Sequence, residues 1–253
     1  MNTEKIILEA QHLTHIFPDG TVGIEDVNLQ INVGDFMIIS GANGSGKTVL
    51  MRHLNGLLKP TSGTIFLDGR LIHKNIAEVR KRVGLIFQNS DTQFVGQTVA
   101  EDVAFGPENL NLPRQEVEQI VDEVLGVVGL KEVVNHSPHQ LSGGQKRKLA
   151  IAGVLAMKPD VVIFDEPFTG LDYPGVKQVL GELVRLHQSG HTIIVVTHEL
   201  EKVLAHGTRL VVMYQGKIVL DGVPESVIDG VAAYGIRVPL KTGERVDSLT
   251  WLG

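Results

Sequence analysis

The segment Gly41-Ala-Asn-Gly-Ser-Gly-Lys-Thr48 constrains the fold of this chain more than any other feature. It matches the pattern G-x-x-x-x-G-K-[ST], in which successive backbone N–H groups curl around a chain of phosphates. The apolar run 36–39 precedes it, and a helix that we expect to continue to about Leu58, before Pro60, follows it. A strand, a glycine-rich turn and a helix in this order predict a phosphate-binding loop, because the helix N-terminus adds partial positive charge.

Two side chains of this loop carry charge or bind metal. Lys47 would supply a positive charge to the β- and γ-phosphates, and the Thr48 hydroxyl is placed to ligate Mg²⁺. A flexible Gly/Ser loop is the alternative, but the strand–helix context favours phosphate binding. The cradle would consist of Gly41, Ala42, Asn43, Gly44, Ser45 and Gly46.

A second apolar run, residues 161–164, ends in the adjacent carboxylates Asp165 and Glu166. Ligands bind at the carboxyl ends of strands in doubly wound sheets. Asp165 would hold Mg²⁺ through water, and Glu166 would polarise the attacking water. Such a strand end can also be merely solvated. The phosphate-binding loop in the same chain favours the catalytic interpretation.

The order of strand and helix patterns predicts an α/β fold with a mostly parallel central sheet. Val27, Leu29 and Ile31 alternate with polar residues, which indicates a half-exposed antiparallel strand in an N-terminal β subdomain. Further strands are expected at 64–67, 192–196, 210–214 and 217–220, the last two as a hairpin, and helices at about 145–157 and 175–189.

The block between about residues 107 and 139 has a different character. Apolar residues recur there at helical spacing, and no Val/Ile-rich strand interrupts them; they are Val117, Ile120, Val121, Val124, Leu125 and Val128. We therefore expect a single domain over residues 1–253, with an inserted helical subdomain at about 107–158 and a C-terminal tail at about 226–253.

The expected helical subdomain contains a second candidate phosphate-binding surface, Leu141-Ser142-Gly143-Gly144-Gln145. Ser142 is a plausible N-cap of the helix that follows, and the glycine N–H groups are available to an anion. One chain needs only one cradle for one nucleotide. The second surface therefore suggests contact with a nucleotide that another subunit holds.

Composition excludes several other classes of protein. The 253 residues include no cysteine, which excludes disulfides, Cys-ligated zinc, iron–sulfur clusters and thiol nucleophiles. A net charge of −6 argues against a dedicated nucleic-acid binder. The first residues do not form a signal peptide, and no apolar run approaches the ~18–20 residues of a membrane span. We expect a cytoplasmic protein.

In order and approximate spacing, these motifs resemble the nucleotide-binding subunits of ATP-binding cassette (ABC) transporters. The resemblance covers about residues 5–225 and extends to Gln88, Leu171-Asp172 and His198. It implies a P-loop NTPase fold that binds ATP and Mg²⁺, with Thr48, Gln88 and Asp165 around the metal. It also implies two ATP–Mg²⁺ sandwiched in a dimer, each between one subunit's P-loop and the other subunit's LSGGQ signature.

The resemblance assigns roles to residues that are unremarkable by themselves. Phe17 would stack on adenine, and Gln88 would sense Mg²⁺ and the attacking water and link the site to a membrane partner. His198 would contact the γ-phosphate together with Lys47. Across the dimer, Ser142 and Gly144 would bind the γ-phosphate of the opposite ATP, and Asp172 would form the D-loop.

Two segments, residues 87–107 and 145–157, resemble the ATPases of energy-coupling factor importers, which take up vitamins, cobalt and nickel. That resemblance implies a second ATPase subunit, either a copy or a paralogue, a transmembrane coupling protein and a small substrate-binding membrane protein. It places this chain at the cytoplasmic face of the cell membrane. The surface near residues 88–105 would contact the membrane protein.

Three residues depart from the family pattern. Val49, within the nucleotide-binding set, replaces a hydroxyl residue that would touch the α-phosphate. Phe168 replaces a small polar residue after Asp-Glu-Pro, and Tyr173 stands after Asp172 where relatives have proline. None of these changes removes a catalytic group, although Tyr173 leaves the D-loop conformation open.

Two other functions are compatible with part of this pattern. One is a soluble ABC ATPase of DNA repair or translation. Repair-type relatives insert long coiled coils before the signature, whereas this chain has room only for a small helical subdomain, and translation-type relatives usually carry two cassettes. The other is a nucleotide-gated scaffold without hydrolysis, against which the full set of Lys47, Asp165, Glu166 and His198 argues.

Overall fold

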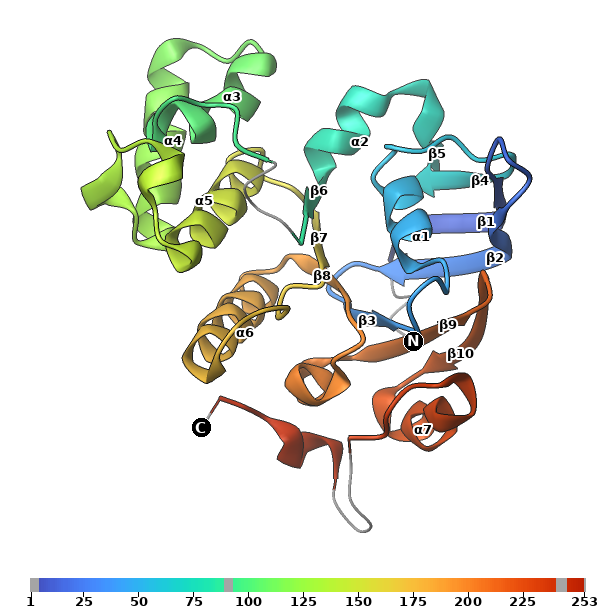
Figure 1. Ribbon diagram of the computed structural model, residues 1–253. Helices are drawn as coiled ribbons and strands as arrows, with labels where there is room; N and C mark the ends of the chain where they lie inside the picture. Colours follow the sequence, from blue (N-terminus) through green and yellow to red (C-terminus); the bar gives the residue numbers. More distant parts are fainter. Residues whose placement is uncertain (1–4, 89–92, 240–244, 253) are drawn as a thin grey trace.

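The computed structural model describes residues 5–88, 93–239 and 245–252, and their strands form two sheets (Figure 1). One is antiparallel with the order β2-β1-β4-β5, and the other has the order β10-β9-β3-β8-β7-β6. The strands are β1 Ile6–Ile16, β2 Val22–Asn32, β3 Phe36–Ser40, β4 Ser62–Leu67, β5 Arg70–Leu71, β6 Val83–Ile86, β7 Val161–Asp165, β8 Thr192–Val196, β9 Arg209–Tyr214 and β10 Lys217–Gly222. The helices are α1 Lys47–Leu54, α2 Ile76–Arg82, α3 Val99–Asn109, α4 Arg114–Val128, α5 Gly143–Leu155, α6 Tyr173–Gln188 and α7 Pro224–Val227.

The six-stranded sheet lies at the centre of the molecule and separates two hydrophobic cores. Strands β3, β6, β7, β8 and β9 run parallel, and only β10 pairs antiparallel. Successive residues of a strand point to opposite faces. Phe36 and Ile38 accordingly join the core beneath α6, whereas Met37 and Ile39 join the core shared with α1 and the antiparallel sheet. The mostly parallel α/β architecture expected from the sequence is confirmed.

The antiparallel sheet also follows the sequence pattern. Val27, Leu29 and Ile31 of β2 are buried, and the intervening Asn28 and Gln30 are exposed. Strands β4 and β5 form a short hairpin around the turn Asp68-Gly69.

Helix α1 ends at Leu54 and not near Leu58, so the expected end is wrong. Gly56, with φ +72°, turns the chain out of the helix, and the N–H groups of Leu57 and Leu58 both donate to the Arg52 carbonyl. The Asn55 side chain donates to the Val83 carbonyl and so attaches this turn to β6.

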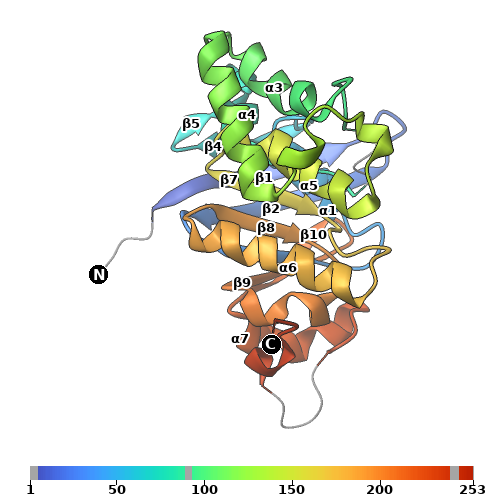
Figure 2. The same ribbon diagram turned by 90° about the vertical axis from the view of Figure 1, so that its left-hand side faces the viewer.

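Helices α3, α4 and α5 gather in a separate block beside β6 and β7, away from the antiparallel sheet (Figures 1 and 2). The block begins at Val99, earlier than the expected boundary near residue 107, because Thr98 and Glu101 form a capping box. Pro107 lies inside α3 and does not precede it. Helix α5 begins with the two glycines of the signature.

The C-terminal segment returns to the main body. A 3₁₀ turn, Val246–Leu249, places Trp251 beside α6, where its ring lies 5.2 Å from the ring of Tyr173. His206 Nε2 and Thr250 Oγ1 approach to 3.1 Å in the same region. Within the part of the chain that the structure describes, no helix combines the length and the apolar character needed to cross a membrane.

Candidate active site

The phosphate-binding loop connects β3 to α1 and leaves no space for side chains at two of its glycines. Gly41 and Gly46 have φ values of +157° and +101°. A Cβ on Gly41 would lie 2.3 Å from the Met213 carbonyl oxygen, and one on Gly46 would lie 2.7 Å from the Gly23 carbonyl oxygen. The fold of the chain itself therefore requires glycine at these positions.

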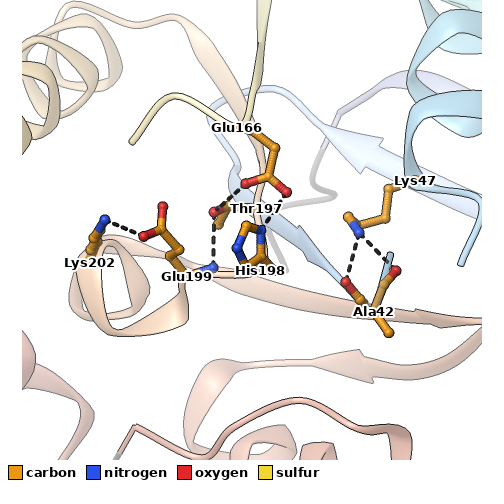
Figure 3. A network of polar contacts seen from close by, with 8 residues as sticks. Ala42, Lys47, Glu166, Thr197, His198, Glu199 and Lys202 are labelled. Atoms are coloured by element: carbon orange, nitrogen blue, oxygen red, sulfur yellow. Dashed lines mark hydrogen bonds and ion pairs between the residues drawn. The ribbon is translucent and has the colours of Figure 1, made fainter. Parts of the chain in front are cut away.

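Lys47 is buried at the start of α1 and folds back over its own loop (Figure 3). Its Nζ donates to the carbonyl oxygens of Gly41, at 2.7 Å, and Ala42, at 3.1 Å. Burial lowers the pKa of Lys47, and the charges of Glu166 and Asp165 oppose that shift. The ammonium group is thus confined in a site with little water, where an anion would interact with it strongly.

Asp165 ends β7 and faces the same loop. Burial, followed by the neighbouring charge of Glu166, raises the pKa of Asp165 to about 6, while Arg52 and Lys47 act in the opposite direction. Taking a carboxylate out of water disfavours its charged form, so a further cation would stabilise it here.

Glu166 is held by two residues that follow the neighbouring strand β8 (Figure 3). Thr197 Oγ1 donates to Glu166 Oε2 at 3.1 Å, and His198 Nδ1 lies 2.9 Å from Glu166 Oε1. The Glu166 backbone adopts a left-handed φ of +46°, and its N–H donates to the Val196 carbonyl. This uncommon backbone conformation and the two side-chain contacts together restrict the Glu166 carboxylate to one orientation.

A pocket of about 360 Å³ brings most of the predicted residues together. Its walls include Phe17, residues 43–49, Gln88, Asp165 and Glu166. His198 reaches it through Glu166. Gly41 and Ala42 contribute carbonyl groups that hold Lys47.

The signature lies elsewhere in the chain. None of Leu141, Ser142, Gly143, Gly144 and Gln145 lines the pocket, as far as the described residues show. Ser142 caps α5: its Oγ accepts from the Gln145 N–H, and Gln145 Oε1 accepts from the Ser142 N–H. Ser142, Gly143 and Gly144 are exposed, so this helix start is open to solvent.

Asp172 is the N-cap of α6, and its side chain accepts from the Gly175 N–H at 3.0 Å. Tyr173 and Pro174 take the first two helical positions, so the proline expected after Asp172 is displaced by one residue and the helix still begins there. Phe168, the second departure, is fully buried in the core beneath α6.

Sequence reasoning missed Thr197. It is fully buried, and its hydroxyl donates to Glu166 and accepts from the Glu199 N–H. The available signal was position: Asp165 pairs with Val196, so residues after β7 and β8 meet at one edge of the sheet.

Comparison with known proteins agrees with this geometry. Residues 24–169 match the family described as ABC transporter. The chain is 45% identical to the energy-coupling factor transporter ATP-binding protein EcfA of Methanocaldococcus jannaschii, over 92% of this chain and 86% of that protein. A solved cbiO1 protein from Clostridium perfringens, part of the ABC transporter complex cbiONQ, superposes with a TM-score of 0.81 and 38% identity, covering 91% of this chain and 96% of that one.

A dimeric ATP-binding cassette, solved with ADP and Pi in a post-hydrolysis state, superposes with a TM-score of 0.77 and 26% identity. The superposition covers 86% of this chain and 99% of that one.

Proposed function

Because this chain belongs to the ABC transporter family, we propose that it is the ATP-hydrolysing subunit of an energy-coupling factor importer. The observation that carries the proposal is the Glu166 carboxylate, which Thr197 and His198 hold at the rim of the pocket that contains Lys47. A fixed carboxylate beside a confined ammonium suits the attack of water on a terminal phosphate.

In this proposal the residues of the pocket divide the work. Phe17 stacks on adenine, and the loop N–H groups with Lys47 bind the phosphates. Glu166 orients the attacking water. His198, which is hydrogen-bonded to Glu166, stabilises the charge that develops on the γ-phosphate. Thr197 keeps the Glu166 carboxylate from turning away.

The oxygen donors of Thr48, Gln88 and Asp165 suit Mg²⁺, which prefers hard oxygen ligands. A cation beside Asp165 would stabilise the charged form of this half-buried carboxyl group, which burial otherwise disfavours. When bound, Mg²⁺ would supply positive charge to the transferring phosphoryl group.

The exposed signature supports a dimer of ATPase subunits, whether the second is a copy or a paralogue. Ser142 and Gly144 lie outside the pocket of their own chain and are free to complete the pocket of the other. Asp172, at the N-terminus of α6, would contact the same interface. Closure with ATP and opening after hydrolysis would then form the mechanical cycle.

A groove of about 900 Å³ between α3 and α4 is our candidate for the contact with the transmembrane coupling protein. Its floor includes Ala104, Val117 and Val121. The basic residues on its rim, Arg114 and Lys131, already pair with Glu118 and Asp122, so Glu101 and Glu108 leave excess negative charge. The groove fits an amphipathic helix with basic residues, and the chain would be peripheral to the membrane.

Within the contact surface expected near residues 88–105, the apolar side chains of Val95 and Phe105 are exposed. The rest of the expected contact surface includes residues 89–92, which lie outside the described residues.

Glu166→Gln tests the catalytic assignment. This variant is expected to bind ATP normally while its turnover falls by about 100-fold or more, because the amide cannot polarise water as a carboxylate does. Glu199→Gln is the matched control, since Glu199 pairs with Lys202 and does not line the pocket. Near-normal turnover in Glu166→Gln, measured as phosphate release with and without Mg²⁺, would remove Glu166 from this role.

Affinity purification from detergent-solubilised membranes tests the transport assignment. Co-purification of a polytopic coupling protein and a small membrane protein would support an importer, and a second ATPase chain would indicate a mixed dimer. Recovery of soluble proteins alone would favour the repair or translation type of ATPase. Absence of any Mg²⁺-dependent hydrolysis would favour a nucleotide-gated scaffold.

A further inference from the structure

Two histidines lie behind the aromatic residue that the proposed function assigns to adenine. His15 is on β1, Phe17 directly follows that strand, and Val49 and His53 are on α1, which packs against β1 and β2 (Figure 1). Two residues along a strand advance about as far as four residues along a helix, roughly 6–7 Å. His15 accordingly lies beside His53, and Phe17 and Val49 both lie beside Gly23.

The rings are in direct contact. The centroids of His15 and Phe17 are 4.7 Å apart at an interplanar angle of 81°, and those of His15 and His53 are 4.8 Å apart at 63°. Both are edge-to-face arrangements, which aromatic rings favour. Phe17 is thus supported by His15, and His15 by His53.

Gly23 and Val49 restrict the position of the Phe17 ring from another direction. A Cβ on Gly23 would lie 2.9 Å from Phe17 Cε2 and 3.3 Å from both methyl groups of Val49. Only a glycine in β2 leaves room for the ring at this place. Phe17 nevertheless lines the pocket and is only half-buried, so part of its surface remains available to a ligand.

His53 is fixed and uncharged at neutral pH. It is fully buried, and its Nδ1 lies 3.1 Å from the Leu58 carbonyl oxygen, to which it donates. Burial, and then electrostatic repulsion from His15, lower the pKa of His53 to about 4. A neutral ring tied to the turn after α1 is a rigid support for the rings that pack on it.

We propose that His15 and His53 are positioning residues for the nucleotide base: they hold the Phe17 ring in the orientation that stacks on adenine and connect it to α1. This helix begins at Lys47, so one element sets both the base end and the phosphate end of the site. The inference rests on the proposed function, because it requires that Phe17 stacks on a nucleotide base.

The inference predicts weaker binding of the nucleotide base and unchanged binding of the phosphates. His15→Ala is expected to raise the Kd for ATP by about two- to tenfold, as for the loss of one aromatic contact, and to leave the Kd for inorganic tripolyphosphate unchanged. His15→Phe keeps a flat ring and is expected to restore ATP affinity. Both dissociation constants are measurable by titration calorimetry on the full chain.

His12→Ala is the matched control. His12 lies on the same strand but is exposed and paired with Asp26, outside the ring cluster. Equal weakening of ATP and tripolyphosphate binding by His15→Ala would indicate general disruption of the site and overturn the inference. So would unchanged ATP affinity in His15→Ala when Phe17→Ala weakens ATP binding.

A Phe17→Ala background tests both histidines at once. If they act through Phe17, neither His15→Ala nor His53→Ala will change ATP affinity further in that background. A persistent effect there would overturn the inference. If Phe17→Ala itself leaves ATP affinity unchanged, the assignment of Phe17 in the proposed function fails, and the inference fails with it.

Discussion

Helices α1 and α5 begin at the two phosphate-binding surfaces that we propose, and these helix starts are built in opposite ways. Helix α1 follows a partly buried loop, with Gly46 as its N-cap and no side-chain cap, and two loop glycines, Gly41 and Gly46, have no space for a Cβ. Helix α5 begins at the surface with a complete capping box, and a Cβ on Gly143 or Gly144 would meet nothing within 4 Å.

The difference shows where the requirement for glycine comes from. At α1 the chain's own backbone imposes it, because the Met213 and Gly23 carbonyl oxygens fill the space. At α5 nothing in the described residues of the chain imposes it. If activity requires glycine at Gly143 and Gly144, a molecule that binds at this surface must impose the requirement. A nucleotide held by another subunit would be such a molecule.

The largest effect on ATP hydrolysis is expected from a substitution at the start of α1. Lys47→Ala removes the cation confined against the loop, and kcat/KM for ATP should fall by about 100- to 1,000-fold. Steady-state phosphate release would measure this fall. Lys146 or Lys148 would not serve as a control, since both are on α5 near the signature; Lys59, which follows α1 outside the pocket, provides a control in Lys59→Ala. A loss below tenfold in Lys47→Ala would contradict the assignment.

Mixing two inactive variants tests whether the α5 surface serves another chain. Gly144→Asp places a negative charge where a γ-phosphate would bind, so it should inactivate by about 10- to 100-fold. Dimers that combine Gly144→Asp with Lys47→Ala contain one intact composite site, and the mixture should recover up to about a quarter of the normal activity. No recovery in samples shown by sedimentation to contain mixed dimers would contradict the two-chain site.

The free energy of unfolding should also distinguish the two helix starts. Gly46→Ala forces a side chain into a left-handed backbone against a carbonyl oxygen and should lower the free energy of unfolding by about 2–4 kcal/mol. Gly144→Ala should change it by no more than about 0.5 kcal/mol, because the site is open. Urea unfolding of both variants measures the difference, and equal losses would remove the contrast.

The smallest expected effect concerns pH and belongs to α1. The pKa of His53 falls from 6.5 to about 4 on folding, so the unfolded chain binds more protons between those values. Stability should therefore decrease as pH falls from about 6.5 to 4, and it is fully present above 6.5. His53→Gln should make the loss of stability over this interval smaller by about 2–3 kcal/mol, measured by urea unfolding at several pH values. An unchanged slope would show that His53 does not titrate in this way.

Local pattern predicted most of the fold and, at the candidate site, the phosphate-binding loop and the strand end at Asp165 and Glu166. The roles of Phe17, Gln88 and His198 came from the family resemblance and remain predictions. Continuous apolar runs in the sequence predicted most strands of the central sheet, and β8 has the predicted bounds, residues 192–196. Strand β6 was not predicted, because it has only four residues and Gly84 interrupts its apolar run. That glycine is needed for a distant contact, since a Cβ there would lie 2.2 Å from Val154 on α5.

Contacts between distant segments could not be predicted from pattern alone. Glu166 and His198 were each identified, but their bond depends on the register between β7 and β8. The support that His15 and His53 give to Phe17 depends on how α1 packs against β1. Apolar periodicity carries no information on such pairings, which tertiary packing decides.

The contact between Trp251 and Tyr173 has a practical consequence for handling the protein. The end of the described chain lies next to the start of α6, where Asp172 forms the N-cap. A fluorescent label attached at Trp251 would lie beside the start of α6 and would crowd the D-loop that we propose at Asp172. A label on an exposed residue of β1 such as Gln11 avoids that surface, and for turnover measurements it is the sounder choice.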